Sequence, residues 1–163
     1  MEIKRMIIAN SGPIISFARA DYLDLLEETV KEIIIPNAVF EDIVVKGIGR
    51  PGAEEVKEAV WIKKKEAKDK DSVEKLSERL GKGESEAIVL AKELEAILLI
   101  DDSEARKEAE RIGVECIGTL RILKEAKEMR LIERVKPVLD RLRDSGLRIK
   151  RDLYFLFLES VEE

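Results

Sequence analysis

The stretch GESEAIVLAKELEAILLIDD, residues 83–102, decides the fold of this chain. A helical pattern that carries Glu84 near its start leads into a short apolar run, residues 96–100, which stops at Asp101 and Asp102. An apolar run of this length with helical patterns on both sides predicts a strand buried on both faces. The two aspartates would then lie at the carboxyl end of that strand, the edge of an open parallel sheet where ligands bind. The stretch therefore predicts an acidic site at the edge of a sheet.

The length and composition of the chain predict one domain over residues 1–163. A chain of 163 residues, 45% of them hydrophobic, is long enough to bury a core of its own. Its apolar runs are all far shorter than the roughly 18 residues that a membrane-spanning helix needs. The first residues do not resemble a signal peptide, because their apolar run is short and ends in a turn. We therefore expect a cytoplasmic protein with no membrane partner.

The residue types present restrict the chemistry. The chain has no histidine, which excludes Ser-His and Cys-His nucleophiles and His-ligated zinc. Its one cysteine, Cys116, lies in an apolar run and is expected to be a buried, inert thiol. Carboxylates, Lys, Arg, hydroxyls and hard metal ions remain. A charged fraction of 40%, no glutamine and only two asparagines also suggest a thermophilic source.

Charge is distributed unevenly along the chain. The net charge is −5, which argues against a protein whose whole surface binds nucleic acid. Residues 119–151, however, hold 11 Lys and Arg against 5 Asp and Glu, so the remainder carries the acidic excess. An acidic part beside a basic part suits a metal site that acts on a polyanion, and solvated helix faces are the plainer interpretation.

The order of the predicted elements indicates the fold class. Strands are predicted at residues 4–9, 32–35, 96–100 and 114–117, with a short charged edge strand at 61–65. Helical patterns occupy residues 14–30 with a break near Asp21, and residues 37–45, 51–60, 71–80, 103–112, 120–129, 135–144 and 152–161. Parallel neighbours need right-handed crossovers through helices. We therefore predict an α/β fold, a three-layer α/β/α sandwich with a central parallel sheet of four or five strands.

In that topology several oxygen ligands would converge on one sheet edge. They are Asn10, Glu41, Glu84, Glu86, Asp101 and Asp102. Carboxylates brought close together repel one another unless a cation enters. Mg²⁺ or Mn²⁺ would relieve this repulsion and could activate water against a phosphodiester without histidine.

Each of these residues also has a structural interpretation. Asp102 could cap the helix that follows it, and Glu84 and Glu86 could complement the positive end of their own helix. Glu41 could face solvent on an amphipathic helix. The turn that begins at Ser11 could cradle a phosphate at a helix start, although a plain turn explains it as well.

The chain resembles the PIN-domain superfamily of metal-dependent ribonucleases over nearly its whole length, within a prokaryotic subgroup related to toxin-type PIN nucleases. The resemblance rests on IIANSGPIISFARADYLDLL, IIIPNAVFEDI, GRPGAEE, GKGESEAIVLAKE, LLIDD, IGTLRILKEAK and VKPVLDRLRDSGLRIKRDLY. It implies an α/β sandwich and hydrolysis of single-stranded RNA that depends on Mg²⁺ or Mn²⁺.

The resemblance also assigns residues. It places the first acid of the family on Asn10, the helical Glu on Glu41, the third acid on Glu86 with Glu84 beside it, and the last acid on Asp101 or Asp102. Ser11 matches the small hydroxyl residue that follows the first acid and would orient the substrate. PIN nucleases usually carry Asp at the position of Asn10. An amide oxygen can still bind a hard cation but brings no charge, so metal affinity should fall.

Two functional hypotheses follow. The first is an endoribonuclease in which Glu41, Glu86, Asp101 and Asp102 are catalytic and Lys and Arg from the basic part of the chain guide single-stranded RNA. A role in a toxin–antitoxin pair is one form of this hypothesis. The second is a PIN-like module, impaired by Asn10, that binds RNA or a protein partner such as an antitoxin. A receiver-type phosphoacceptor is disfavoured because its acidic pair should follow the first strand.

The last helical pattern bears on oligomeric state. Apolar residues within 153–158 could serve a homodimer, which we expect, while packing in the core is the safer interpretation of the same residues.

Overall fold

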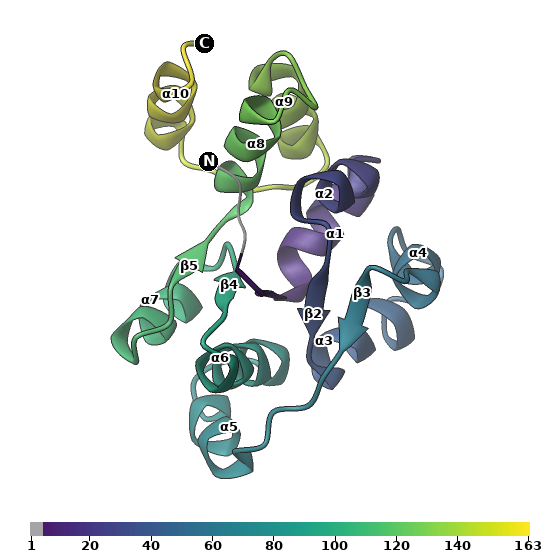
Figure 1. The fold of residues 1–163 in the computed structure, drawn as a ribbon, viewed down its shortest axis with the longest axis vertical. Helices are drawn as coiled ribbons and strands as arrows, with labels where there is room; N and C mark the ends of the chain where they lie inside the picture. The colour runs from purple at the N-terminus through teal and green to yellow at the C-terminus, as the bar shows by residue number, and fades with distance from the viewer. Residues whose placement is uncertain (1–4) are drawn as a thin grey trace.

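The computed structural model describes residues 5–163, which form one sheet of five strands, all parallel, in the order β3-β2-β1-β4-β5 (Figure 1). The strands are β1 (Ile7–Ala9), β2 (Ile33–Ile35), β3 (Ile62–Lys64), β4 (Ile97–Leu99) and β5 (Cys116–Ile117). The start predicted for the first strand, Lys4, lies outside the described residues. The predicted parallel sheet is confirmed, and the strands are shorter than the apolar runs that predicted them.

Helices connect every pair of consecutive strands. They are α1 (Ser11–Arg19), α2 (Leu23–Val30), α3 (Asn37–Phe40), the π-helical η1 (Glu41–Val45), α4 (Ala53–Glu58), α5 (Lys70–Ser77), α6 (Lys82–Leu94), α7 (Ser103–Arg111), α8 (Thr119–Glu128), α9 (Val135–Asp144) and α10 (Arg151–Ser160). The predicted break near Asp21 is present, with that residue at a φ of 62° between α1 and α2. One predicted helix differs: the pattern over residues 37–45 is α-helical only to Phe40 and continues as a π turn, in which the Lys46 N–H donates to the Glu41 carbonyl at 2.8 Å.

Side chains that alternate along the strands divide the core into two layers. Ile7 of β1 packs with buried residues of α1, α2, α8, α9 and α10. Its neighbour Ile8 packs on the opposite face with residues of α5, α6 and α7. Figure 1 shows these helix groups on either side of the sheet. The three-layer α/β/α arrangement predicted from the element order is thus confirmed.

The edge strand has the character predicted for it. In the described part of the chain β3 pairs only with β2. In this pair Ile33 of β2 lies opposite Ile62 of β3. Ile62 is buried, whereas Lys63 and Lys64 are exposed. Charged side chains on an edge strand discourage pairing with further strands.

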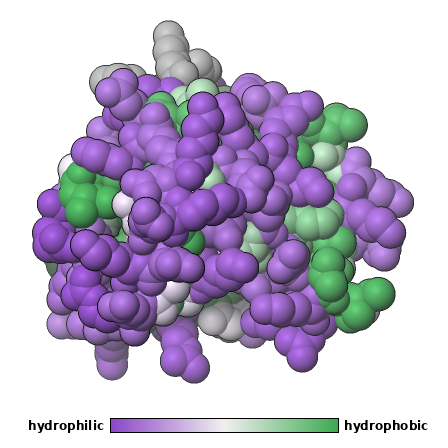
Figure 2. Space-filling view, turned by 90° about the horizontal axis from the view of Figure 1, so that it is seen from below, coloured by the Kyte–Doolittle hydropathy of each residue, from purple (hydrophilic) through white to green (hydrophobic). Residues whose placement is uncertain are grey.

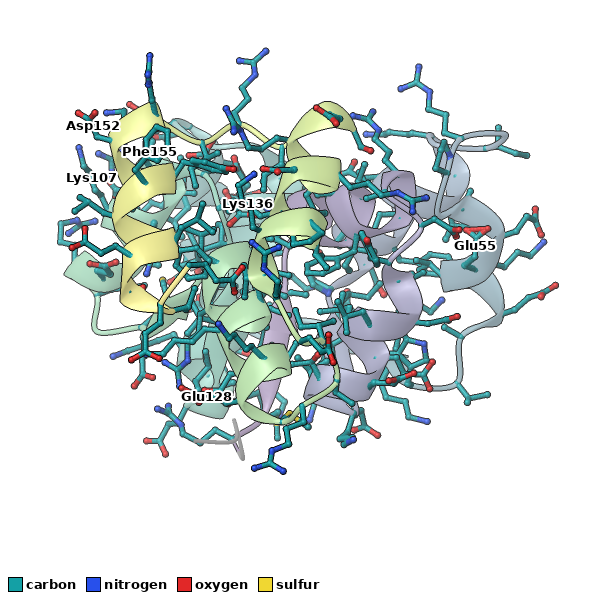
Figure 3. All side chains as sticks on the ribbon, turned by 90° about the horizontal axis from the view of Figure 1, so that it is seen from above. Glu55, Lys107, Glu128, Lys136, Asp152 and Phe155 are labelled. Atoms are coloured by element: carbon teal, nitrogen blue, oxygen red, sulfur yellow. The ribbon has the colours of Figure 1, made fainter. Side chains whose placement is uncertain are left out.

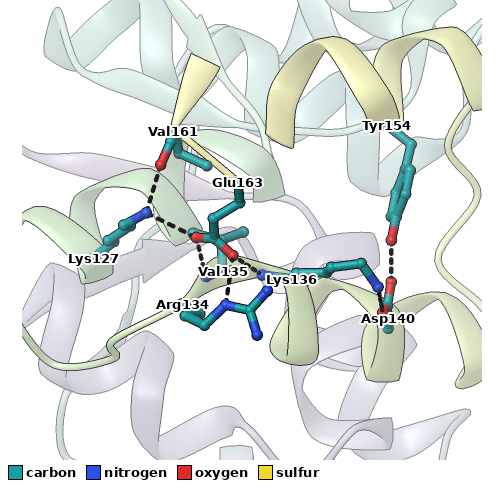
Figure 4. Close-up of polar contacts among 8 residues, drawn as sticks. All are labelled: Lys127, Arg134, Val135, Lys136, Asp140, Tyr154, Val161 and Glu163. Carbon is teal, nitrogen blue, oxygen red and sulfur yellow. Dashed lines mark hydrogen bonds and ion pairs between the residues drawn. The ribbon is translucent and has the colours of Figure 1, made fainter. Parts of the chain in front are cut away.

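A buried carboxylate ties the last helices together (Figure 4). Glu163, whose side chain is 5% exposed, accepts hydrogen bonds from the backbone N–H groups of Val135 (2.7 Å) and Lys136 (2.9 Å) at the start of α9. It also accepts one from Lys127 Nζ of α8 at 2.8 Å. The negative charge therefore lies where the dipole of α9 is positive and a cation is adjacent.

Helix α10 divides its apolar residues between core and surface. Tyr154 and Leu158 are buried, while Leu153, Phe155 and Leu156 are 49, 55 and 63% exposed. Figure 3 labels Phe155 on this helix. Core packing thus accounts for part of the 153–158 run, and the homodimer stays a prediction.

The surface is largely hydrophilic. Figure 2 shows one face on which hydrophobic side chains form separate groups among polar ones. In the described part of the chain no helix combines the length and apolar character needed to cross a membrane. Cys116 is half-buried, and burial raises the pKa of its thiol to about 11, which keeps it protonated and unreactive.

Candidate active site

The carboxyl ends of β1 and β4 open into a cleft with a volume of about 530 Å³. The cleft also borders η1 and the start of α6. Its lining residues are Asn10, Ser11, Gly12, Pro13, Asp42, Lys46, Gly81, Lys82, Gly83, Glu84, Asp101 and Asp102. Parallel strands end at this edge, so residues distant in sequence meet there. An acidic cleft therefore lies at the sheet edge where the sequence predicts an acidic site, although some residues that line it differ from those expected.

Asn10 occupies the centre of this edge. Its backbone N–H donates to the Leu99 carbonyl at 3.0 Å, which fixes the residue beside the end of β4. The residue is only 7% exposed, yet its side-chain amide makes no hydrogen bond to any described residue. The side-chain amide instead reaches the cleft, where solvent or a ligand can bond to it. The side-chain amide of Asn10 is thus available to bind a ligand in the cleft.

The acid that η1 contributes is Asp42, not Glu41. Asp42 lines the cleft, whereas Glu41 is exposed and does not. Val39 is fully buried and therefore marks the inward face of this helix. Asp42, three positions after Val39, lies on the same face, whereas Glu41, two positions after it, does not. Glu41, which was expected at the site, therefore does not line this cleft, and counting from Val39 points to Asp42 instead.

Gly83 allows Asp42 to approach α6. A Cβ atom at Gly83 would lie 2.9 Å from Asp42 Oδ2 and 3.5 Å from Val39 Cγ2. The carboxylate therefore occupies the space that any other residue would fill. On its other side Asp42 forms an exposed ion pair with Lys46 at 3.5 Å.

Glu84 lines the cleft and Glu86 does not. Glu84 Oε1 accepts a hydrogen bond from the Gly81 N–H at 3.1 Å, which caps its own helix. Burial raises the pKa of Glu84, and the nearby charges of Asp102 and Glu104 raise it further. Glu86 instead accepts from the Ala38 N–H at 3.1 Å and caps α3. Two residues separated by one position project from different sides of a helix, so α6 delivers only one of the pair.

The two aspartates after β4 have different partners. Asp102 Oδ1 accepts from the Ala105 N–H at 3.0 Å and caps α7, as the structural interpretation proposed, and the residue still lines the cleft. Both oxygens of Asp101 are bonded by Thr119, from its N–H at 2.8 Å and its hydroxyl at 2.6 Å.

Thr119 was not among the predicted site residues. It is 1% exposed and begins α8, directly after β5. The adjacent Gly118 is needed, since a Cβ there would lie 2.8 Å from Asp101 Oδ1. A hydroxyl residue at the end of a strand next to β4 was the available signal.

The cations at the cleft come from the middle of the chain. Lys46 and Lys82 line it, and no residue of the basic segment 119–151 does. Arg141 and Arg143 of that segment lie over the rings of Tyr22 and Tyr154, 5.2 and 4.2 Å from the ring centroids. Ser11, half-buried at the start of α1, lines the cleft as expected.

The donors suit a hard divalent cation by their chemistry. They are carboxylate oxygens and the amide oxygen of Asn10. Within residues 5–163 no three Asp, Glu or Cys side chains are grouped closely enough to form a complete ion cage. Mg²⁺ usually binds through one or two carboxylates, water and substrate phosphates rather than in such a cage. The residues therefore fit an ion that is completed by substrate.

Comparison with known proteins agrees with this geometry. No curated protein matches the chain significantly. The family model for the PIN domain matches residues 6–163, nearly the entire chain. PIN domains are generally nucleases that use divalent metal ions. The five-stranded parallel sheet, the oxygen-lined cleft at its carboxyl edge and the family match agree, and the chain belongs to the PIN-domain family.

Proposed function

We propose that the protein is a metal-dependent endoribonuclease that hydrolyses phosphodiester bonds of single-stranded RNA. The observation that carries this proposal is the convergence of the Asn10 amide with the carboxylates of Asp42, Glu84 and Asp102 on one cleft at the carboxyl edge of the sheet. The raised pKa of Glu84 supports it, because burial and the charges of Asp102 and Glu104 disfavour its ionised form and a cation would reverse that effect.

One or two of the carboxylates of Asp42, Glu84 and Asp102 would bind Mg²⁺ or Mn²⁺ together with the amide oxygen of Asn10, and water and a substrate phosphate would complete its coordination. The ion would supply activation of water and neutralisation of charge at the phosphodiester. Asp101 has a different task in this proposal: because Thr119 bonds both its oxygens, it adds negative charge at a fixed position beside Asp102. Glu41 and Glu86 are left out of the set, since neither lines the cleft.

Substrate binding would fall to the residues at the mouth of the cleft. Lys82 at the start of α6 is exposed and free of ion pairs with described residues, so it can contact a phosphate. Ser11 and the first N–H groups of α1 can orient the same phosphate. The cleft volume of about 530 Å³ suits one nucleotide unit, and single strands can present their units separately.

The test is cleavage of a fluorophore-labelled single-stranded RNA with Mn²⁺ and with EDTA. We expect Mn²⁺-dependent cleavage by the wild type and its loss in Asp102→Asn, which removes charge while keeping a good helix cap. Asp71→Asn, an exposed substitution on α5, is the matched control and should cleave normally. Equal cleavage by wild type and Asp102→Asn would contradict the proposal.

Asn10 favours a second function, an RNA- or protein-binding module without turnover. An amide adds no charge to the ion site, so ion affinity should be lower than with Asp. If the wild type binds RNA without cleaving it and Asn10→Asp gains Mn²⁺-dependent cleavage, this second function is the correct one. A role in a toxin–antitoxin pair belongs to either function, and growth arrest on expression of the wild type, absent in Asp102→Asn, would support the nuclease form of it.

A further inference from the structure

A second groove lies at the other end of α1 from the candidate active site. It forms where the turn between α1 and α2 faces α4 and the segment that enters β3, and its volume is about 490 Å³. Helix α1 starts at Ser11 in the catalytic cleft, and Ala18 near its end lines this groove. Seven residues of helix separate the two by about 10 Å along the axis. The groove is therefore separate from the candidate active site.

All charged side chains that line the groove are acidic. They are Asp21, Asp24, Glu27, Glu55 and Glu58. None of the five forms an ion pair or a side-chain hydrogen bond with any residue of the described chain. Figure 3 shows Glu55 on α4 at the edge of the molecule, directed to solvent. Unpaired like charges along one groove repel each other, and a cationic partner would remove that repulsion.

Apolar side chains share the groove with these acids. Trp61 and Leu23 are half-buried, and Val60 is 80% exposed. The walls are rigidly joined, because α4 is anchored by buried Val56 and Gly52 approaches α1 closely. A Cβ at Gly52 would lie 3.0 Å from Ala18 Cβ. The groove thus offers an apolar surface with a row of acids beside it.

We propose that this groove is a docking site for a basic amphipathic segment of a partner protein. Lys or Arg side chains of the segment would pair with the carboxylates, and an apolar side chain would pack on Trp61 and Val60. The apolar side chains of Trp61 and Val60 favour a polypeptide over a bare metal ion, which could use only the carboxylates. RNA is repelled by the same charges. The partner is thus a polypeptide distinct from the RNA substrate.

The groove carries its own optical reporter, because Trp61 is the only tryptophan of the chain. The probe is a short synthetic peptide with Lys and Leu at helical spacing, added while Trp61 emission is recorded. A second peptide, with Glu in place of Lys, keeps the apolar pattern and reverses the charge. We expect a saturable emission change with the Lys peptide and none with the Glu peptide.

Matched double variants locate the binding. Glu55→Gln with Glu58→Gln removes two exposed acids three positions apart on α4. Asp71→Asn with Glu74→Gln removes an equivalent exposed pair on α5, so this variant has the same net charge as the α4 variant. We expect the α4 pair to weaken binding of the Lys peptide about tenfold, a difference of about 1.4 kcal/mol. The α5 pair should bind like the wild type, and circular dichroism confirms that both variants are folded.

Three results would overturn the proposal. One is the absence of saturable binding to the wild type, and another is equal affinity in the α4 and α5 variants. The third concerns the occupant. If sedimentation velocity shows concentration-dependent association of the wild type that the α4 variant abolishes, the groove binds a second copy of this chain instead.

Discussion

Thr119 holds the carboxylate of Asp101 with two hydrogen bonds, one to each oxygen, from its N–H at 2.8 Å and its hydroxyl at 2.6 Å. The pair joins the end of β4 to the start of α8, so the edge of the sheet and the helix beyond β5 are fixed together. It also means that two adjacent aspartates in the sequence have different surroundings: one is held on both oxygens, while Asp102 uses one oxygen as a cap.

Thr119→Val should destabilise the protein by about 1 kcal/mol, because valine keeps the shape and the N–H bond to Asp101 Oδ1 but removes the hydroxyl bond to Oδ2. Thr119→Ser keeps the hydroxyl and should recover most of this loss. Urea unfolding followed by circular dichroism measures both variants. A valine variant as stable as the wild type would show that the hydroxyl bond contributes nothing.

Gly83→Ala separates stability from ion binding. Alanine normally stabilises a helix relative to glycine by about 0.5–1 kcal/mol. Here its Cβ would meet Asp42 Oδ2 at 2.9 Å and displace the carboxylate. We expect unchanged or slightly higher stability in urea, and weaker Mn²⁺ binding by calorimetry. Gly12→Ala is the control, since Gly12 lines the same cleft and nothing lies within 4 Å of its Cβ position. Equal Mn²⁺ affinity in both variants would exclude Asp42 from the ion site.

Glu163 gives the protein a defined acid sensitivity. Burial alone would raise its pKa, but the hydrogen bonds from Lys127, Val135 and Lys136 outweigh burial and the pKa is lowered. A lowered carboxyl pKa contributes stability that is fully present above the ordinary value of about 4.3. This stability is lost as the pH falls through the folded-state pKa.

Glu163→Gln should therefore lower the free energy of unfolding at pH 7 by about 1.5–3 kcal/mol, the range for hydrogen bonds to a charged group. The difference from the wild type should shrink as the pH falls below 4. Urea titrations across pH 2–7 measure it, with Glu159→Gln, an exposed substitution on α10, as the control. A difference that is constant across this range would assign the effect to packing rather than to charge.

The order of elements could be predicted from sequence because burial on both faces produces short apolar runs that periodicity detects. Helix α9 was predicted to the residue, since its apolar spacing is regular and Gly146 follows it with a φ of 119°. The π turn of η1 left no signal in the hydrophobic pattern. It depends on tertiary packing and on Gly47, where a Cβ would lie 2.3 Å from the Ile43 carbonyl oxygen.

The site was predicted by region rather than by residue. Asn10, Ser11, Glu84, Asp101 and Asp102 line the cleft as expected. Glu41 and Glu86 do not line it. One position along a helix turns a side chain by about 100° and two positions by about 200°, so Asp42 faces the cleft in place of Glu41 and Glu84 in place of Glu86. Asp42 and Thr119 depend on contacts between segments far apart in sequence, with Gly83 and with Asp101, which no local pattern contains.

The most direct measurement compares two adjacent acids of η1 in Mn²⁺-dependent cleavage of single-stranded RNA. Asp42→Asn removes the carboxylate that faces the cleft, and Glu41→Gln removes the one that faces solvent. The proposed site predicts a loss of at least about a hundredfold in kcat/KM for Asp42→Asn, comparable to removing a key electrostatic group. It predicts wild-type cleavage for Glu41→Gln. Loss of cleavage in Glu41→Gln with normal cleavage in Asp42→Asn would contradict the site.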